Sequence, residues 1–316
     1  MSQIQLPADF FPLMQQQWGS QVAEELCASL STTDPSVSVR LNPAKAPVSA
    51  LPYEQVPWCA DGYYLPERPA FTFDPLLHAG AYYVQDASSM FLSHVVRQYV
   101  DRPVVALDLC AAPGGKSTLL HGCLPKGSLL VSNEPMRQRA QVLAENLTKW
   151  GSPYTVVSQN YPADFTSLSH LFDFIVTDVP CSGEGMFRKE EAAITEWSEE
   201  VVSHCAERSA EILDNAASCV RPGGRLVLST CTFAPEENEV AVDGIFVSIG
   251  RVPATALVKG QLALDDAGYI IADESTKTNI PGVFAVGDVR TKALRQVVTA
   301  VADGAVAAHY AEEYLL

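Results

Sequence analysis

The chain has 316 residues, of which 47% are hydrophobic and 18% charged, and its formal net charge is −16. This composition is typical of a globular protein with one to three cores, and the acidic excess repels nucleic acid except at a local basic face. No apolar run reaches the length of a membrane helix, and the first residues lack the plan of a signal peptide. We therefore expect a cytoplasmic protein without a membrane partner.

Residues 1 to about 100 form the first predicted region. A helix is expected over residues 12–30 (PLMQQQWGSQVAEELCASL), and the aromatic and proline-rich stretch that follows predicts short strands and ordered loops. From Val104 onward the pattern becomes regular. Buried strands are predicted for five short apolar runs, at 104–109, 128–134, 154–159, 172–178 and 223–230, with helices at 136–150 and 198–220. This alternation predicts an α/β fold with a parallel sheet and helices on both faces.

The eight cysteines are scattered and include no Cys-x-x-Cys pair. This spacing argues against a zinc ribbon and against a redox dithiol, so we expect no metal site. In a reducing compartment most of the cysteines should be plain buried thiols. We assign that role to Cys27, Cys59, Cys123, Cys205 and Cys219.

The stretch DLCAAPGGKST (residues 108–118) follows the first regular strand and opens a helical segment. Gly115-Lys116-Ser117 matches the end of a Walker A loop, but Cys110 stands where that motif has its leading glycine, and the Gly-x-Gly-x-x-Gly fingerprint is absent. Small residues and a helix start let a ligand approach the backbone closely. A nucleoside without a triphosphate is therefore favoured, with an ordinary strand-to-helix turn as the alternative for the glycines alone.

Acidic residues and cysteines follow the strands at the same predicted edge of the sheet. Glu134 ends the second strand, where an acidic side chain can bind two ribose hydroxyls, and Asp178 ends a later one. Cys181 and Cys231 each follow a strand end, so the parallel topology predicts that they converge near the ligand. A thiolate that adds to C6 of a pyrimidine makes C5 nucleophilic enough to take a methyl group from a sulfonium donor.

These motifs resemble the Nol/Nop/Sun family of RNA cytosine-5 methyltransferases, and most of all the bacterial enzymes that act on small-subunit ribosomal RNA. The resemblance runs from about residue 6 to 239 through SVRLNPAK, VPWCADGYY, HAGAYYVQDASSMF, DLCAAPGGKST, DVPCSGEGMFRK and STCTFAPEENE. It implies a Rossmann-like S-adenosylmethionine methyltransferase sheet over 101–240, behind a small α+β RNA-recognition region over 1–100.

The resemblance also implies roles for single residues. Cys231 would attack C6 of the cytosine, and Cys181 would assist release of the methylated base. Asp178 would contact the methyl donor and the polar edge of the cytosine, and Lys116 would lower the thiolate pKa or steady the intermediate. The S-adenosylmethionine site would comprise Cys110, Ala111, Ala112, Pro113, Gly114, Gly115, Lys116, Glu134, Asn160 and Asp178. Asn160 is a small departure, because the family often has an acidic residue there.

RNA is expected to lie over the first hundred residues. Four aromatic side chains there are candidates for stacking on bases, with a packed aromatic core as an equal alternative for each: Trp58, Tyr63, Tyr64 and Tyr83. Arg188 and Lys189 are candidate phosphate contacts that would partly offset the acidic total.

Residues 242–316 resemble a different family, the C-terminal part of bacterial thioredoxin reductase, through VDGIFVSIGRVPAT, GYIIADESTKTNIPGVFAVGDV and RQVVTAVADGAVAA. In that family Asp288 would bind the ribityl chain of FAD, and residues 295–297 would lie near the isoalloxazine ring. The FAD and NADPH glycine fingerprints and the dithiol of that family are missing, so we expect no tight flavin binding.

Both resemblances break at residues 239–242, which predicts a chimera with a foreign C-terminal α/β segment over 241–316. Two strand-like pieces, at 244–249 and 269–272, are expected to fill the sheet edge that the family's missing strands leave open. The expected function is RNA cytosine-5 methylation. The alternatives are an inactive chimera that binds only RNA or cofactor, and an FAD-binding reductase fragment.

Overall fold

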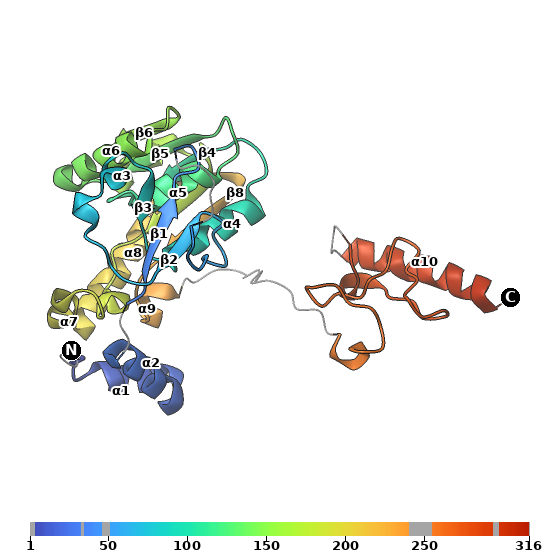
Figure 1. Cartoon of the computed structure of the whole chain (residues 1–316). Coiled ribbons are helices and arrows are strands. Elements are labelled where there is room, and N and C mark those ends of the chain that lie inside the picture. Colours follow the sequence, from blue (N-terminus) through green and yellow to red (C-terminus); the bar gives the residue numbers. More distant parts are fainter. Residues whose placement is uncertain (1–3, 33–34, 46–50, 240–254, 293–296, 316) are drawn as a thin grey trace. The chain divides into compact units, whose positions relative to one another are not determined.

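The computed structural model of the chain describes residues 4–32, 35–45, 51–239, 255–292 and 297–315. The chain divides into two compact units, residues 1–241 and 242–316 (Figure 1). The finer division into domains at residues 100 and 240 stays a prediction.

A fully parallel sheet of five strands, in the order β6-β5-β4-β7-β8, forms the centre of the first unit (Figure 1). Its strands are β4 (Val105–Asp108), β5 (Leu129–Asn133), β6 (Thr155–Ser158), β7 (Phe172–Asp178) and β8 (Val220–Ser229). From β4 the chain adds β5 and then β6 on one side of β4, and it then crosses back to add β7 and β8 on the other side of β4. The carboxyl ends of β4 and β7 therefore form a topological switch point, where open α/β sheets bind their ligands.

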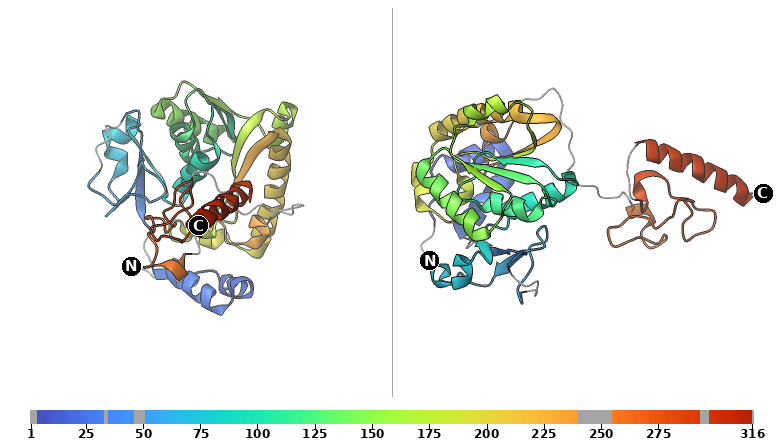
Figure 2. Two further views of the ribbon diagram at one scale, coloured as in Figure 1. Left: turned by 90° about the vertical axis from the view of Figure 1, so that its right-hand side faces the viewer. Right: turned by 90° about the horizontal axis from the view of Figure 1, so that it is seen from above.

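Helices cover both faces of this sheet (Figure 2). The helices described in this unit are α1 (Phe10–Trp18), α2 (Ser20–Thr32), α3 (Pro75–His78), α4 (Leu92–Tyr99), α5 (Gly115–Cys123), α6 (Arg137–Trp150), α7 (Glu191–Glu196), α8 (Glu199–Cys219) and α9 (Pro235–Asn238). Because side chains alternate along a strand, Ala106 packs with α4 and α5 whereas its neighbour Leu107 packs with α8. The predicted α/β fold with a parallel sheet is confirmed.

A small antiparallel sheet precedes the large one. It consists of β1 (Val37–Leu41), β2 (Gly62–Leu65) and β3 (Tyr82–Val84), in the order β2-β1-β3. Tyr63 on β2 is buried, and Trp58 and Tyr64 pack against the core that also holds α4 and α5. The Trp58 indole N–H donates to the carbonyl of Ala87 at 2.6 Å. The packed-core alternative therefore holds for these three aromatic residues, and their stacking on RNA bases is not supported.

The prediction of one helix over residues 12–30 was wrong, because α1 and α2 are separate. Gly19 ends α1 with a φ of 81°, and its N–H bonds the carbonyl of Gln15. A left-handed residue of this kind stops the helical hydrogen-bond pattern, and glycine adopts it without steric strain. Phe10 of α1 packs edge-on against Phe187 and Trp197, which anchors α1 next to α7.

The second unit contains two short 3-10 turns, at Ala256–Val258 and Gly287–Val289, and α10 (Val297–Leu315). Its buried centre is an ion pair of 2.7 Å between Arg290 and Asp303. The hydrogen bonds from Arg290 hold the pKa of Asp303 well below its usual range. Asp288, the expected flavin contact, is exposed, and residues 295 and 296 lie outside the described residues.

The expectation that residues 269–272 extend the large sheet was wrong. Ile270 instead forms β-bridges with Leu264 and Arg290 of its own unit, where it belongs to a small apolar cluster. The other candidate piece, at 244–249, lies outside the described residues. In the part of the chain that the structure describes, no helix is long and apolar enough to cross a membrane.

Candidate active site

The loop between β4 and α5 lies at the switch point and approaches α6 closely. Gly114 has a φ of 112°, and a Cβ there would lie 3.3 Å from the side chain of Leu143. The Ala111 N–H donates to the carbonyl of Asn133 at 2.8 Å, which ties the loop to the end of β5. The first amides of α5 have no partner within their own helix, because its hydrogen bonds begin one turn later. The loop therefore offers a narrow backbone cradle with free donors.

Side chains from α6 and β3 fix this cradle from outside. The Pro113 carbonyl accepts hydrogen bonds from the Asn146 amide at 2.8 Å and from the Tyr83 hydroxyl at 3.3 Å. Arg139 donates to the carbonyl of Ala112 at 3.1 Å. Sequence reasoning missed Arg139 and Asn146, although their spacing of seven residues places them on one face of a helix. The hydroxyl of Tyr83, one of the candidates for stacking on RNA bases, thus contacts the loop.

Glu134 and Asn160 lie at the carboxyl ends of β5 and β6. Asn133 holds Asn160 in place through its amide, which donates to the Asn160 carbonyl at 2.9 Å and accepts the Asn160 N–H at 3.0 Å. The Glu134 carboxylate is only 2% exposed; it accepts the Met136 N–H at 3.0 Å and lies 3.5 Å from Arg139. An ionised carboxylate has about four lone-pair sites, so Glu134 keeps capacity for further donors.

Asp108, at the end of β4, is fully buried. The Ser117 hydroxyl donates to one of its oxygens at 2.6 Å, and the other oxygen has no hydrogen-bond partner. Burial raises the pKa of Asp108 to about 7. Three features of this edge fit a ligand with an amino group and ribose hydroxyls, such as S-adenosylmethionine. They are the unpartnered oxygen of Asp108, the first amides of α5 and the Glu134 carboxylate at the end of β5.

Cys181 and Cys231 meet beside this cradle. Their sulfur atoms lie 3.1 Å apart, and the Cys231 N–H points at the Cys181 sulfur at 3.3 Å. The hydrogen bond from Cys231 lowers the pKa of Cys181, and the same bond together with burial raises the pKa of Cys231. Cys110 differs, because burial raises its pKa to about 11 and keeps it a neutral thiol.

Lys116 and Asp178 form an ion pair next to the two thiols. The Lys116 ammonium, in the first turn of α5, lies 2.8 Å from one oxygen of Asp178, at the end of β7. The Ser229 hydroxyl, at the end of β8, donates to the other oxygen at 2.9 Å. Three elements thus fix the Asp178 carboxylate. In this arrangement the direct partner of Lys116 is Asp178.

A buried polar network supports the two cysteine loops. The Ser182 hydroxyl donates to Glu184 at 2.9 Å, and its N–H donates to Glu237 at 3.0 Å. The Gly185 N–H donates to the Cys231 carbonyl at 2.8 Å, and a Cβ at residue 185 would lie 2.8 Å from that same oxygen. Sequence reasoning missed this network, because the bonds between its two halves join residues that lie 46 to 55 positions apart and no short motif marks the contact.

Arg188 and Lys189, the two candidate phosphate contacts, are less accessible to RNA than the sequence suggested. Lys189 forms an ion pair with Asp86, which neutralises its charge, and Arg188 is partly buried. Within the described ranges, no cluster of three or more His, Cys, Asp or Glu side chains could hold a metal ion.

The parallel sheet with a nucleoside cradle at its switch point defines a Rossmann-like methyltransferase fold. The family model for the 16S rRNA methyltransferase RsmB/F matches residues 100–263, and that for the N-terminal domain of 16S rRNA methyltransferase RsmF matches residues 6–87. The chain belongs to the RsmB/F family of 16S rRNA methyltransferases.

Curated relatives include ribosomal RNA small subunit methyltransferase F of two bacteria. The Pectobacterium atrosepticum protein is 33% identical over 248 residues, covering 74% of this chain and 51% of that protein. The Serratia proteamaculans protein is 34% identical over 203 residues, covering 62% of this chain and 42% of that protein. The chain thus spans about half the length of these relatives or less.

Solved structures share the fold. NSun6 from Pyrococcus horikoshii with SFG superposes with a TM-score of 0.62 at 16% identity, covering 84% of this chain and 91% of that chain. A methyltransferase homolog protein from the same organism gives a TM-score of 0.59 at 24% identity, covering 72% of this chain and 73% of that one.

Proposed function

We propose that this chain is an S-adenosylmethionine-dependent methyltransferase that modifies C5 of a cytosine in small-subunit ribosomal RNA. The observation that carries the proposal is the Cys181–Cys231 contact of 3.1 Å beside the Asp178 carboxylate, at the sheet edge that holds the nucleoside cradle. One thiol can add to a pyrimidine ring, and the second can then remove a proton from the neighbouring carbon. Family membership and the curated relatives support the same chemistry. We place this activity in the cytoplasm, where ribosomal RNA is found.

The proposed roles follow from where the side chains lie. The Cys231 thiol loses its proton to water as its sulfur forms a bond to C6 of the cytosine, and the displaced ring electrons make C5 nucleophilic. S-adenosylmethionine supplies the methyl group. Cys181 then takes the proton from C5, the electrons of that bond restore the C5–C6 double bond, and the C6–sulfur bond breaks with its electrons returning to Cys231. Asp178 holds the polar edge of the base, and Lys116 keeps Asp178 in place.

The cofactor site is proposed at the cradle and the adjoining strand ends. Residues 110–116 would contact the amino acid part, Glu134 the ribose hydroxyls, and Asn160 the adenine side, with Asp178 between cofactor and base. The burial of Glu134 and its remaining acceptor capacity support the ribose contact.

The second resemblance, to thioredoxin reductase, gains no support from the comparisons reported above. The RsmB/F family model continues to residue 263, past the junction expected at 239–242. We therefore do not propose a chimera or FAD as a cofactor, and an inactive binding protein is not favoured.

The direct test supplies the full chain with S-adenosylmethionine labelled in its methyl group and with unmethylated small-subunit ribosomal RNA. After digestion to nucleosides, mass spectrometry should find the label in 5-methylcytidine for the natural chain and in no nucleoside for Cys231→Ala. Label in another nucleoside, or equal label with both proteins, would refute the proposal.

A further inference from the structure

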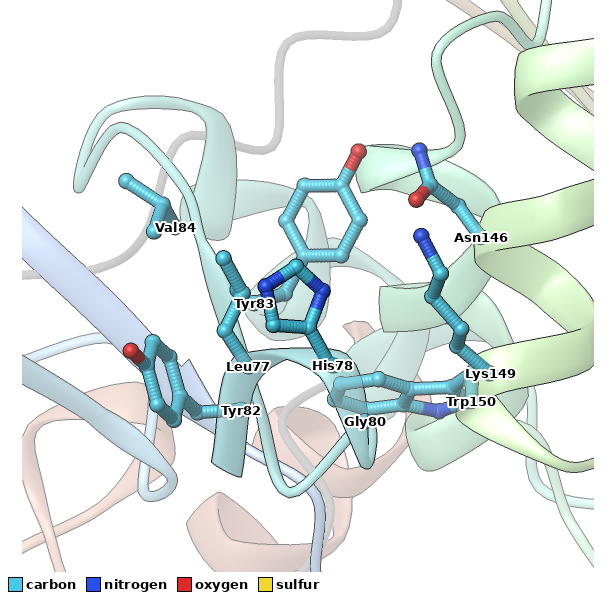
Figure 3. A pocket seen from close by; sticks show the side chains of 9 residues that line it. All are labelled: Leu77, His78, Gly80, Tyr82, Tyr83, Val84, Asn146, Lys149 and Trp150. Atoms are coloured by element: carbon cyan, nitrogen blue, oxygen red, sulfur yellow. The ribbon is translucent and has the colours of Figure 1, made fainter. Parts of the chain in front are cut away.

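A pocket of about 250 Å³ lies between β3, α3 and the end of α6 (Figure 3). Tyr83, His78, Asn146 and Lys149 come from these three elements and border one common space in Figure 3. The pocket belongs to neither the cysteine pair nor the ion pair of Lys116. Small-molecule sites usually measure about 300–1,000 Å³, so this volume suits a single planar ring.

Aromatic side chains form much of the pocket wall. Tyr83 packs edge-on against Trp150 with ring centroids 6.5 Å apart. The Tyr82 hydroxyl donates to the Asp74 carboxylate at 2.7 Å, which fixes the position of its ring. Held aromatic rings offer a surface on which an unpaired base can stack, and such stacking is largely independent of base identity.

The rim of the pocket is basic, in contrast to the chain as a whole. Lys149 is exposed, and within the described residues no ion pair of its ammonium is found. The Lys45 ammonium donates to the main-chain carbonyls of Lys149 and Ala79, so it places a second positive charge next to the main chain of these two residues. His78 is exposed on the same rim. The oxygens of Asp74, which lies next to the wall at Tyr82, already accept the Tyr82 hydroxyl and the Leu76 N–H.

We infer that this pocket holds one unpaired nucleotide of the RNA, with its base against the aromatic wall and its phosphate at Lys149 and Lys45. The inference rests on the proposed function, since it names a site at which the ribosomal RNA substrate binds. The pocket is also tied to the cofactor loop, because Tyr83 and Asn146 both donate to the Pro113 carbonyl. A nucleotide in the pocket therefore borders the walls that fix the cradle.

The test compares Lys149→Ala with Lys126→Ala in the full chain. Lys126 is a matched control, because it is an exposed lysine in the loop before β5 and does not line the pocket. Binding to a single-stranded segment of small-subunit ribosomal RNA is measured by fluorescence anisotropy at several salt concentrations. Lys149→Ala should weaken binding roughly 3- to 10-fold and reduce the salt slope by about 0.7, while Lys126→Ala should change neither.

Equal RNA affinities and salt slopes for Lys149→Ala and Lys126→Ala would overturn the inference. If His78→Ala, a second exposed rim variant, also weakens RNA binding without changing S-adenosylmethionine affinity, the inference is supported. RNA binding is measured without methyl transfer. A natural chain that lacks methyltransferase activity would therefore refute the proposed function, but the comparison of RNA affinities would still test the pocket.

Discussion

The sulfur atoms of Cys181 and Cys231 lie 3.1 Å apart, although 50 residues separate them in the sequence. Each follows the end of a strand, β7 or β8, and these strands are parallel neighbours in the sheet. Their two loops are joined by buried hydrogen bonds, including one between the Ser182 and Thr232 hydroxyls at 3.1 Å. The fold thus brings two thiols into contact, as a nucleophile and a proton acceptor for neighbouring carbons of one ring require.

The two cysteines should give different phenotypes when replaced. Cys231→Ala should abolish methyl transfer, because the bond to C6 cannot form. Cys181→Ala should accumulate a covalent RNA–protein adduct, because the base is attacked but not released. Denaturing gel electrophoresis with labelled RNA detects the adduct as a shifted band. Full activity of Cys231→Ala would show that the nucleophile is assigned wrongly.

Alkylation should reveal the lowered pKa of Cys181. At neutral pH, iodoacetamide should modify Cys181 faster than Cys110, whose pKa burial raises to about 11. In Cys231→Ala the main hydrogen-bond donor to Cys181 is lost, so its pKa should rise and its modification should slow at a given pH. Peptide mass spectrometry over a pH series measures both rates. If Cys181 reacts equally fast in the natural chain and in Cys231→Ala, the hydrogen bond from Cys231 does not lower the pKa of Cys181.

Asp108 should make the protein less stable as the pH rises. Its pKa of about 7 in the folded chain exceeds the ordinary 3.8, so the folded state binds more protons between these values. The free energy of unfolding therefore falls from about pH 4 to about pH 7 and is constant above. Asp108→Asn removes this slope while keeping an acceptor for Ser117. In urea unfolding, the free energy of unfolding of Asp108→Asn relative to that of the natural chain should rise between about pH 4 and pH 7. A difference that stays constant over this range would contradict the raised pKa.

Arg40 on β1 should couple the small sheet to α5. It is 3% exposed and donates to Gln85 at 2.8 Å and to Thr118 at 2.6 Å, with its guanidinium 4.5 Å from the centre of the Trp150 ring. Arg40→Met leaves these buried acceptors unpaired, each costing about 1–3 kcal/mol of unfolding free energy. The cradle at the start of α5 should loosen too, so S-adenosylmethionine affinity should fall. Thr118→Val, which removes one partner alone, should show a smaller loss in urea unfolding and in calorimetry.

Much of the large sheet could be predicted from the sequence, because its buried strands are short apolar runs between turn residues. The predicted helix at 136–150 begins one residue before α6, and the one at 198–220 extends one residue beyond α8 at each end. The break at Gly19 was missed, because the apolar spacing continues across it. The burial of Trp58 and Tyr63 could not be predicted either, since aromatic residues serve cores and RNA surfaces equally well. The Glu184–Glu237 network depends on contacts between distant segments.

The loop at residues 110–116 and Glu134 should together form an S-adenosylmethionine site. Isothermal titration of the full chain with S-adenosylmethionine measures this directly. We expect saturable one-to-one binding that Glu134→Gln weakens, because the ribose hydroxyls lose a charged acceptor. Absence of binding by a folded sample, or equal affinity of both proteins, would contradict it.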